Sequence, residues 1–211
     1  HYIIDKSNIK DFKNEILNAI NANNKISYLL NLDLPNFSSN IYIENKNILA
    51  IYDSIKDLVY ILNIDTLDKD DFDEILVNLL LSDNIKLGYN IKQDIQYFFN
   101  NGYVNITGFC YDIMIAYYLL DSNRSKYLFD YILQDLYDIQ IKKIDSSNTS
   151  GKQLSFFDNE IKNELFLEQV QVENIITYLK GIYLSYDKVT KKLEDDNMID
   201  LFNNIEMPLV E

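Results

Sequence analysis

The spacing of apolar residues along the chain predicts an alternation of helices and strands. Over residues 7–22 apolar side chains recur every three or four positions, the spacing of one buried helix face, and Ser7 is the expected N-cap. Short apolar runs rich in β-branched residues then predict strands at 26–34, 41–44, 48–52 and 58–63. Only residues 45–47 separate the second and third runs, so a hairpin within a meander of three or four strands is expected.

From residue 66 the apolar spacing becomes mainly helical, interrupted by short strand-like runs. The elements expected, in order, are a helix beginning near Thr66 or Asp68, a strand at 85–89, a helix from Asn90 to Gly102, a strand at 103–110 closing at Cys110, and helices at 113–120, 126–136 and 170–193. Residues 145–152 are small and polar residues with three Ser and one Gly, and they predict a loop inside the domain.

This order of elements predicts the fold class. A β-meander, then alternating strands and helices, then helices alone is typical of an α/β domain. We therefore expect one mixed β-sheet flanked by helices, with no internal repeat. A length of 211 residues and an apolar fraction of 47% are enough for a single large core.

The charge balance narrows the function classes. Asp and Glu number 33 against 19 Lys and Arg, which gives a formal net charge of −14. An acidic domain repels phosphate backbones, so a basic DNA-binding module is disfavoured. A nucleic-acid enzyme stays possible, because bound divalent cations can invert the local field.

The amino-acid composition leaves carboxylates as the main candidates for catalytic or metal-binding groups. Cys110 is the only cysteine and His1 the only histidine, which excludes an intrachain disulfide, a Cys-rich zinc site and His-dependent nucleophilic catalysis. Cys110 is expected to be a small buried hydrophobe. No apolar run is long enough to cross a membrane and no signal peptide is visible, so no membrane partner is expected.

Three stretches carry a resemblance to a known family. Residues 86–94, Lys-Leu-Gly-Tyr-Asn-Ile-Lys-Gln-Asp, resemble the second exonuclease motif of family A DNA polymerases, (V/L)-G-x-N-x-K-x-D. Residues 108–121 resemble that domain's G-x-x-(F/Y)-D-x-M…Y-(I/L)-L. Residues 204–209, Asn-Ile-Glu-Met-Pro-Leu, are similar to the junction that leads into the polymerase part of bacterial DNA polymerase I.

The resemblance implies an RNase H-like (DnaQ-like) 3′–5′ exonuclease fold over residues 1–203, with 204–211 as the start of the junction to a polymerase domain. The chain begins without Met and stops inside an apolar helical pattern, so a domain excised from a longer protein is expected.

In active members of the family, the first strand carries D-x-E, and this chain has no such pair. One alignment places Leu29 and Asn31 at the two carboxylate positions, and a shift of two residues offers Asn31 and Asp33. Leucine cannot bind a metal, and asparagine supplies only a neutral oxygen.

The third family motif, Y-x-x-x-D on a late helix, also has two possible alignments. The favoured one pairs Tyr178 with Ile182 and so loses the carboxylate. The other reads Tyr183 to Asp187 and keeps it, but it requires a deletion before the polymerase junction.

Of the metal-binding carboxylates that the resemblance implies, only Asp94 is retained in both alignments. On its own it would be a weak metal ligand. One carboxylate cannot hold a two-metal centre. The simplest role expected for Asp94 is a solvated or capped acid on a helix face, and Asn90 and Asp112 are expected to be helix N-caps.

The leading hypothesis is a degenerate exonuclease-like domain that has a structural role and no cofactor. Its expected partner is the polymerase domain of the same chain, with DNA bound weakly or through that domain, as a cytoplasmic, nucleoid-associated monomer.

Two alternatives stay open. The first is an active proofreading exonuclease that uses Mg²⁺ or Mn²⁺ on Asp33, Asp94 and Asp187, with Tyr183 orienting the attacking water. The second is a protein-interaction domain that docks a partner through its acidic face. The acidic run at 68–74 is otherwise expected to be a solvated first helical turn.

Overall fold

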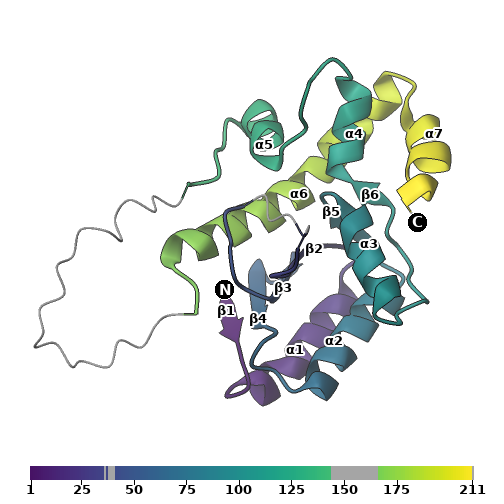
Figure 1. Ribbon diagram of the computed structural model, residues 1–211. Coiled ribbons are helices and arrows are strands. Elements are labelled where there is room, and N and C mark those ends of the chain that lie inside the picture. The colour runs from purple at the N-terminus through teal and green to yellow at the C-terminus, as the bar shows by residue number, and fades with distance from the viewer. Residues whose placement is uncertain (36, 38–40, 144–165, 211) are drawn as a thin grey trace, which may run out of the picture.

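A computed structural model describes residues 1–35, 37, 41–143 and 166–210 of the protein. Within these residues six strands form one mixed sheet in the order β1-β4-β3-β2-β5-β6 (Figure 1). The strands are β1 (Tyr2–Ile4), β2 (Lys25–Asn31), β3 (Ile48–Asp53), β4 (Leu58–Asn63), β5 (Ile85–Gly88) and β6 (Tyr111–Asp112). Strand β3 is antiparallel to β2 and β4, and the other neighbouring pairs are parallel.

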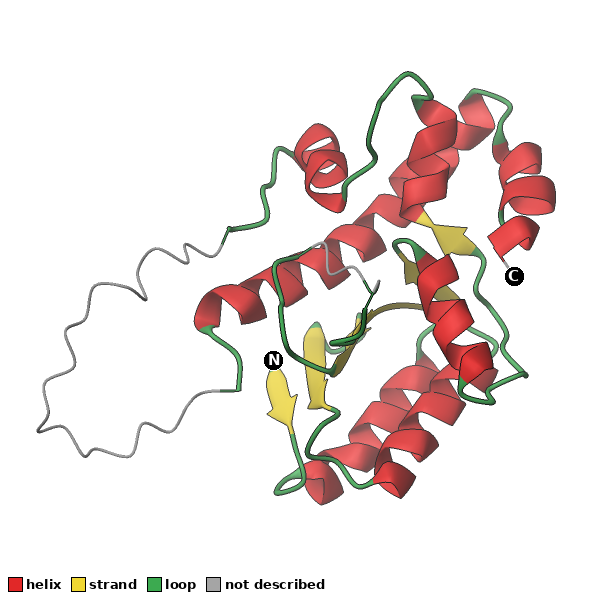
Figure 2. Ribbon diagram, viewed as in Figure 1, coloured by secondary structure: helices red, strands yellow, loops and turns green. Residues whose placement is uncertain are grey.

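Helices cover both faces of this sheet (Figure 2). They are α1 (Ile9–Ala22), α2 (Lys69–Leu81), α3 (Ile91–Asn100), α4 (Ile113–Leu120), α5 (Phe129–Tyr137), α6 (Gln169–Asp195) and the short α7 (Ile199–Leu201), which continues as a π-helical turn (Phe202–Glu206) and a 3-10 turn (Pro208–Val210). Helices α1 and α2 pack together on one side, and the long α6 crosses the other side (Figure 1).

Coverage on both faces explains the near-continuous apolar sequence of the central strands. Every residue of β3 is buried, and so is all of β2 after Lys25. A sheet with one solvated face shows alternating polar residues instead. The predicted α/β class, with a mixed sheet flanked by helices, is therefore confirmed.

The strand predicted at 41–44 is wrong. Its apolar residues Ile41 and Ile43 are buried, but they lie in the connection between β2 and β3, which pair directly with each other. The backbone at Tyr42 and Asn45 has φ values of 59° and 55°. Left-handed residues cannot continue an extended strand, so the segment packs its side chains without joining the sheet.

The strand predicted at 103–110 is also wrong, and so is the burial expected for Cys110. Gly108 adopts φ 74°, which interrupts the extended backbone, and the strand β6 begins only at Tyr111. Phe109 and Tyr111 occupy the buried positions on either side, which leaves the Cys110 thiol exposed.

Several element boundaries also differ from the predictions. Helix α1 begins after Asn8, because the carboxylate of Asp5 accepts hydrogen bonds from Ser7 and holds it in the preceding turn. Helix α2 begins after Asp68, the second of its two predicted starts. The loop predicted at 145–152 lies outside the described residues. Among the helices that the structure describes, none is both long and apolar enough to span a bilayer.

Candidate active site

Strand β2 carries the first candidate motif, and α6 crosses its face in the opposite direction. The Nζ of Lys25, at the start of β2, lies 2.8 Å from the Asp187 carboxylate, and Ser27 Oγ donates a 2.8 Å hydrogen bond to the carbonyl of Leu179. Successive side chains of a strand point to opposite faces. Leu29 and Asn31 therefore share the α6 face with Ser27.

Neither Leu29 nor Asn31 presents a carboxylate on that face. Leu29 is 7% exposed and belongs to the apolar core. The Asn31 side chain is 2% exposed, and its Nδ2 donates hydrogen bonds to the carbonyl oxygens of Ile43 (3.3 Å) and Lys46 (2.6 Å). Where the family resemblance expects a metal ligand, this side chain acts as a donor to the main chain.

Asp94 is positioned by the tight junction between β5 and α3. The strand ends at Gly88, where an added Cβ would lie 2.4 Å from Ile91 Cγ2, so only glycine allows the helix to begin this close. Asn90 occupies the N-cap position with φ 55°, but its side chain makes no capping hydrogen bond.

The Asp94 carboxyl lies in the interior, and the expectation of a solvated or capped acid on a helix face is wrong. It is 6% exposed, and its Oδ2 accepts a 2.8 Å hydrogen bond from the hydroxyl of Tyr28. Burial raises the pKa of Asp94 well above its usual range, and the charge of Asp112 adds to this, while the Tyr28 hydrogen bond opposes it. A carboxyl that retains its proton is a poor ligand for a divalent cation.

Asp112 is the helix cap that the sequence predicted, and it serves two helices. One oxygen accepts from the backbone N–H of Met114 in α4 at 2.9 Å, and from that of Asn90 at 3.0 Å. The other oxygen accepts from the N–H of Ile91, the first residue of α3, at 2.9 Å. Complete burial raises the pKa of Asp112 to about 6, against the opposing effect of these hydrogen bonds.

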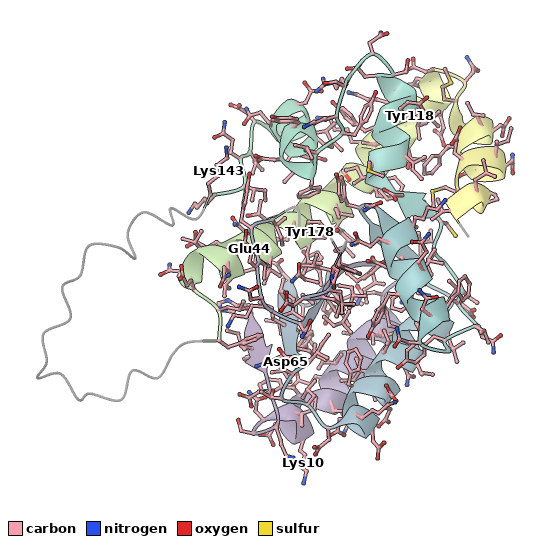
Figure 3. The ribbon with its side chains drawn as sticks, viewed as in Figure 1. Lys10, Glu44, Asp65, Tyr118, Lys143 and Tyr178 are labelled. Atoms are coloured by element: carbon pink, nitrogen blue, oxygen red, sulfur yellow. The ribbon has the colours of Figure 1, made fainter. Side chains whose placement is uncertain are left out.

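Tyr178 and Ile182, the favoured third motif, are both buried on α6. Figure 3 places Tyr178 where α6 crosses the middle of the molecule, and its ring packs against Phe129 with centroids 4.6 Å apart. Burial raises the pKa of Tyr178, and the charges of Asp94 and Asp112 add to the effect. Ile182 is fully buried and supplies no polar atom at the position of the carboxylate.

The alternative carboxylate set is not brought together. Asp187 pairs with Lys25 at the start of β2, whereas Asp33 is exposed two residues beyond its end. A strand of seven residues is about 20 Å long. Tyr183 packs edge-on against Tyr52 near Lys25, not beside Asp94.

Two contributors to this region were not predicted from the sequence. Tyr28 is an aromatic residue within an apolar run, and its hydroxyl donates to Asp94, which lies 66 positions further along the chain. No local pattern in the sequence therefore indicates its role. Asn174 lies in the interior of a helical pattern, and only its polarity among apolar neighbours hints that it needs partners.

The donor set does not fit a two-metal centre. Within the described part of the chain, no group of three or more His, Cys, Asp or Glu side chains is placed to hold a metal ion. The positions that the resemblance assigns to ligands hold Leu29, Asn31, Ile182 and a buried, hydrogen-bonded Asp94.

Comparisons with known proteins place this geometry within a known fold. No family model and no curated protein matches the chain. Among solved structures it is similar to the POL domain of Pol1 from M. smegmatis in complex with DNA primer-template and dNTP (13% identity, TM-score 0.64, 99% of this chain and 30% of that chain). It is similar to Escherichia coli RNase D at 12% identity, with a TM-score of 0.67 over 100% of this chain and 49% of that chain. It is also similar to the Aedes aegypti Nibbler EXO domain at 14% identity, with a TM-score of 0.58 over 96% of this chain and 94% of that chain.

The chain thus spans about a third to a half of the first two of these structures and nearly all of the third. Identities of 12–14% carry the fold and not the activity. Together with the mixed six-stranded sheet and its flanking helices, these likenesses show that the chain has the RNase H-like fold of DnaQ-type 3′–5′ exonuclease domains.

Proposed function

We propose that this chain is a degenerate 3′–5′ exonuclease domain of a DNA polymerase I, in which the fold is kept as a structural platform and hydrolysis is lost. The observation that carries the proposal is Asn31. At a position where an active relative needs a metal-binding carboxylate, its amide donates two hydrogen bonds to the main chain.

The chemistry of the reaction supports this proposal. Two-metal hydrolysis needs carboxylates that bind the ions on both sides of the scissile phosphate. Leu29 and Ile182 offer no ligand atoms, and the raised pKa of Asp94 favours its neutral form. We therefore propose no metal cofactor; Mg²⁺ or Mn²⁺ belongs to the alternative of an active enzyme.

The proposed partner is a polymerase domain of the same chain, and DNA is bound weakly or through that domain. The M. smegmatis structure, which contains a polymerase domain and DNA, supports this placement by its fold. Residues 204–211 are the proposed start of the junction, and Met207 and Val210 in this segment are buried against the rest of the chain. We propose a monomer in the cytoplasm, near the nucleoid.

The acidic-interaction alternative has less support from the contacts. Along the acidic start of α2, Asp68 pairs with Lys6, Asp71 with Lys13, and Asp73 with Lys69. These ion pairs within the chain reduce the charge that this surface would offer to a partner.

Digestion of a 5′-labelled single strand tests the proposal. Because the ligand positions lack carboxylates, the protein is expected to leave both DNA and RNA oligonucleotides intact with 10 mM-range Mg²⁺ or Mn²⁺, about the concentration that saturates weak carboxylate sites. Asp94→Ala is the matched control, because any true activity must depend on the one retained motif acid. A ladder that forms with the natural chain and vanishes with Asp94→Ala refutes the proposal.

A further inference from the structure

Residues 41–46, which precede β3, lie at the carboxyl end of β2 and contact α6. We call these residues the strap. Asn31, the last residue of β2, donates to two carbonyl oxygens of the strap, those of Ile43 and Lys46. In the view of Figure 3, the labelled Glu44 of the strap overlaps the N-terminal half of α6.

A second asparagine, on α6, also donates a hydrogen bond to the strap. Asn174 of α6 is 1% exposed, and its Nδ2 donates to the carbonyls of Ile41 (3.1 Å) and Lys142 (2.9 Å). Its Oδ1 accepts from the N–H of Lys142 at 3.0 Å. This one amide therefore joins α6, the strap and the stretch at Lys142.

The end of the strap is fixed by Asn47. Its Oδ1 accepts from the N–H of Asp33 at 2.7 Å, and its Nδ2 donates to the Asp65 carboxylate at 2.7 Å. Its carbonyl accepts from the N–H of Ile64, which follows β4. Asn47 thus ties the end of the strap to residues that follow β2 and to residues that follow β4.

The strap also contributes to the apolar core. Ile41 and Ile43 are 0% and 1% exposed, so opening the strap would bring two large apolar side chains into water. The hydrogen bonds from Asn31 and Asn174 orient the strap, and burial of Ile41 and Ile43 stabilises it in this position.

We propose that the strap is a built-in lock that closes the carboxyl end of β2 without a metal ion, with Asn31 and Asn174 as its positioning residues. The inference rests on the proposed function only in identifying Asn31 with a former ligand position. A carboxylate there would bind a cation and repel carbonyl oxygens, whereas the amide attracts them. The lock and a metal site therefore exclude each other at this residue.

Proteolysis at Lys46 reports whether the lock is open, because trypsin can cleave after Lys46 only when the surrounding backbone leaves the surface. Asn31→Asp removes both donors and places a charge against two carbonyls. Cleavage between Lys46 and Asn47, followed by mass spectrometry, is expected to accelerate about ten- to a hundredfold. Asn174→Asp is expected to act in the same direction.

Asn14→Asp is the matched control, since it makes the same chemical change at an exposed position of α1. It is expected to leave cleavage after Lys46 unchanged. Urea unfolding of each variant separates local opening from global destabilisation. The proposal is overturned if Asn31→Asp and Asn174→Asp both fold and leave cleavage after Lys46 unchanged. It is also overturned if cleavage accelerates only in proportion to the loss of global stability.

A second arm uses the natural chain, so it does not depend on how the variants fold. Single-stranded DNA or RNA oligonucleotides at low salt are expected to leave cleavage after Lys46 unchanged. A change of more than about twofold would mean that the strap moves for a nucleic acid and is not a lock. Degradation of the oligonucleotide in the same mixture would refute the proposed function instead, which keeps the two failures distinct.

Discussion

Replacing Asp112 with alanine is expected to lower the free energy of unfolding by about 3–5 kcal/mol, because three backbone N–H groups that point at this fully buried carboxylate lose their acceptor together. These are the N–H groups of Asn90, Ile91 and Met114, at the starts of two different helices. A cap for a single exposed helix contributes only about 1 kcal/mol. The larger value follows from full burial, because water cannot replace the carboxylate.

Asp112→Asn should recover part of this loss. The amide keeps one acceptor oxygen but turns an NH₂ group toward N–H donors. The unfolding free energy is therefore expected to fall by about 2 kcal/mol, roughly half of the loss expected for alanine. Urea unfolding followed by circular dichroism measures both variants. Asp11→Ala, an exposed acid in the first turn of α1, is the matched control and should cost less than about 1 kcal/mol. Equal effects at Asp11 and Asp112 would contradict the two-helix cap.

Asp112 also illustrates what local sequence can predict. Its place before an apolar helical run indicates an N-cap for α4, and the structure confirms that role. The hydrogen bonds to Asn90 and Ile91 join positions more than 20 residues apart, and these depend on β5 and β6 lying side by side. Periodicity thus predicts the elements and their local caps, while the sheet decides which distant groups a cap can also reach.

The same division explains the wrong strand predictions. Apolar residues at 41–44 and 103–110 show where side chains are buried, and Ile41, Ile43 and Phe109 are indeed buried. Burial does not require pairing in a sheet, however. The left-handed backbone at Tyr42 and Gly108 decides that these segments pack against the core as irregular chain.

The candidate site was only partly accessible from the sequence. The lack of D-x-E on β2 is visible in the letters, but the use made of Asn31 depends on the connection that folds back over it. Likewise, the motif locates Asp94, while its burial against Tyr28 depends on the packing of α3 beside β2. A degenerate motif shows which chemistry is missing, and the structure shows which contacts have taken its place.

The Tyr28–Asp94 pair is expected to give the stability of the protein a distinctive pH dependence. The folded-state pKa of Asp94 is raised, so the folded chain binds this proton more tightly than the unfolded chain. The stabilising contribution is therefore fully present below the usual Asp pKa of 3.8 and is lost as the pH rises through the folded value. Asp112 acts in the same direction, between 3.8 and about 6.

Asp94→Asn isolates the contribution of Asp94, because an amide does not titrate and its oxygen can still accept from the Tyr28 hydroxyl. The unfolding free energy of this variant, relative to the natural chain, is expected to increase from pH 4 to pH 8. Urea unfolding at a series of pH values measures it. Asp11→Asn, which removes the same formal charge from an exposed site, is the control variant.

Tyr28→Phe provides the complementary test, since it removes the hydrogen bond that opposes the rise in the pKa of Asp94. The loss in unfolding free energy is expected to be about 1–3 kcal/mol and to be larger at pH 8 than at pH 4, because the ionised carboxylate needs the donor more than the neutral acid does. The double variant Tyr28→Phe with Asp94→Asn should lose that extra pH dependence. If both single variants have pH profiles parallel to that of the natural chain, the pKa of Asp94 does not change on folding, and its carboxylate would then be as available to a cation as that of an ordinary surface acid.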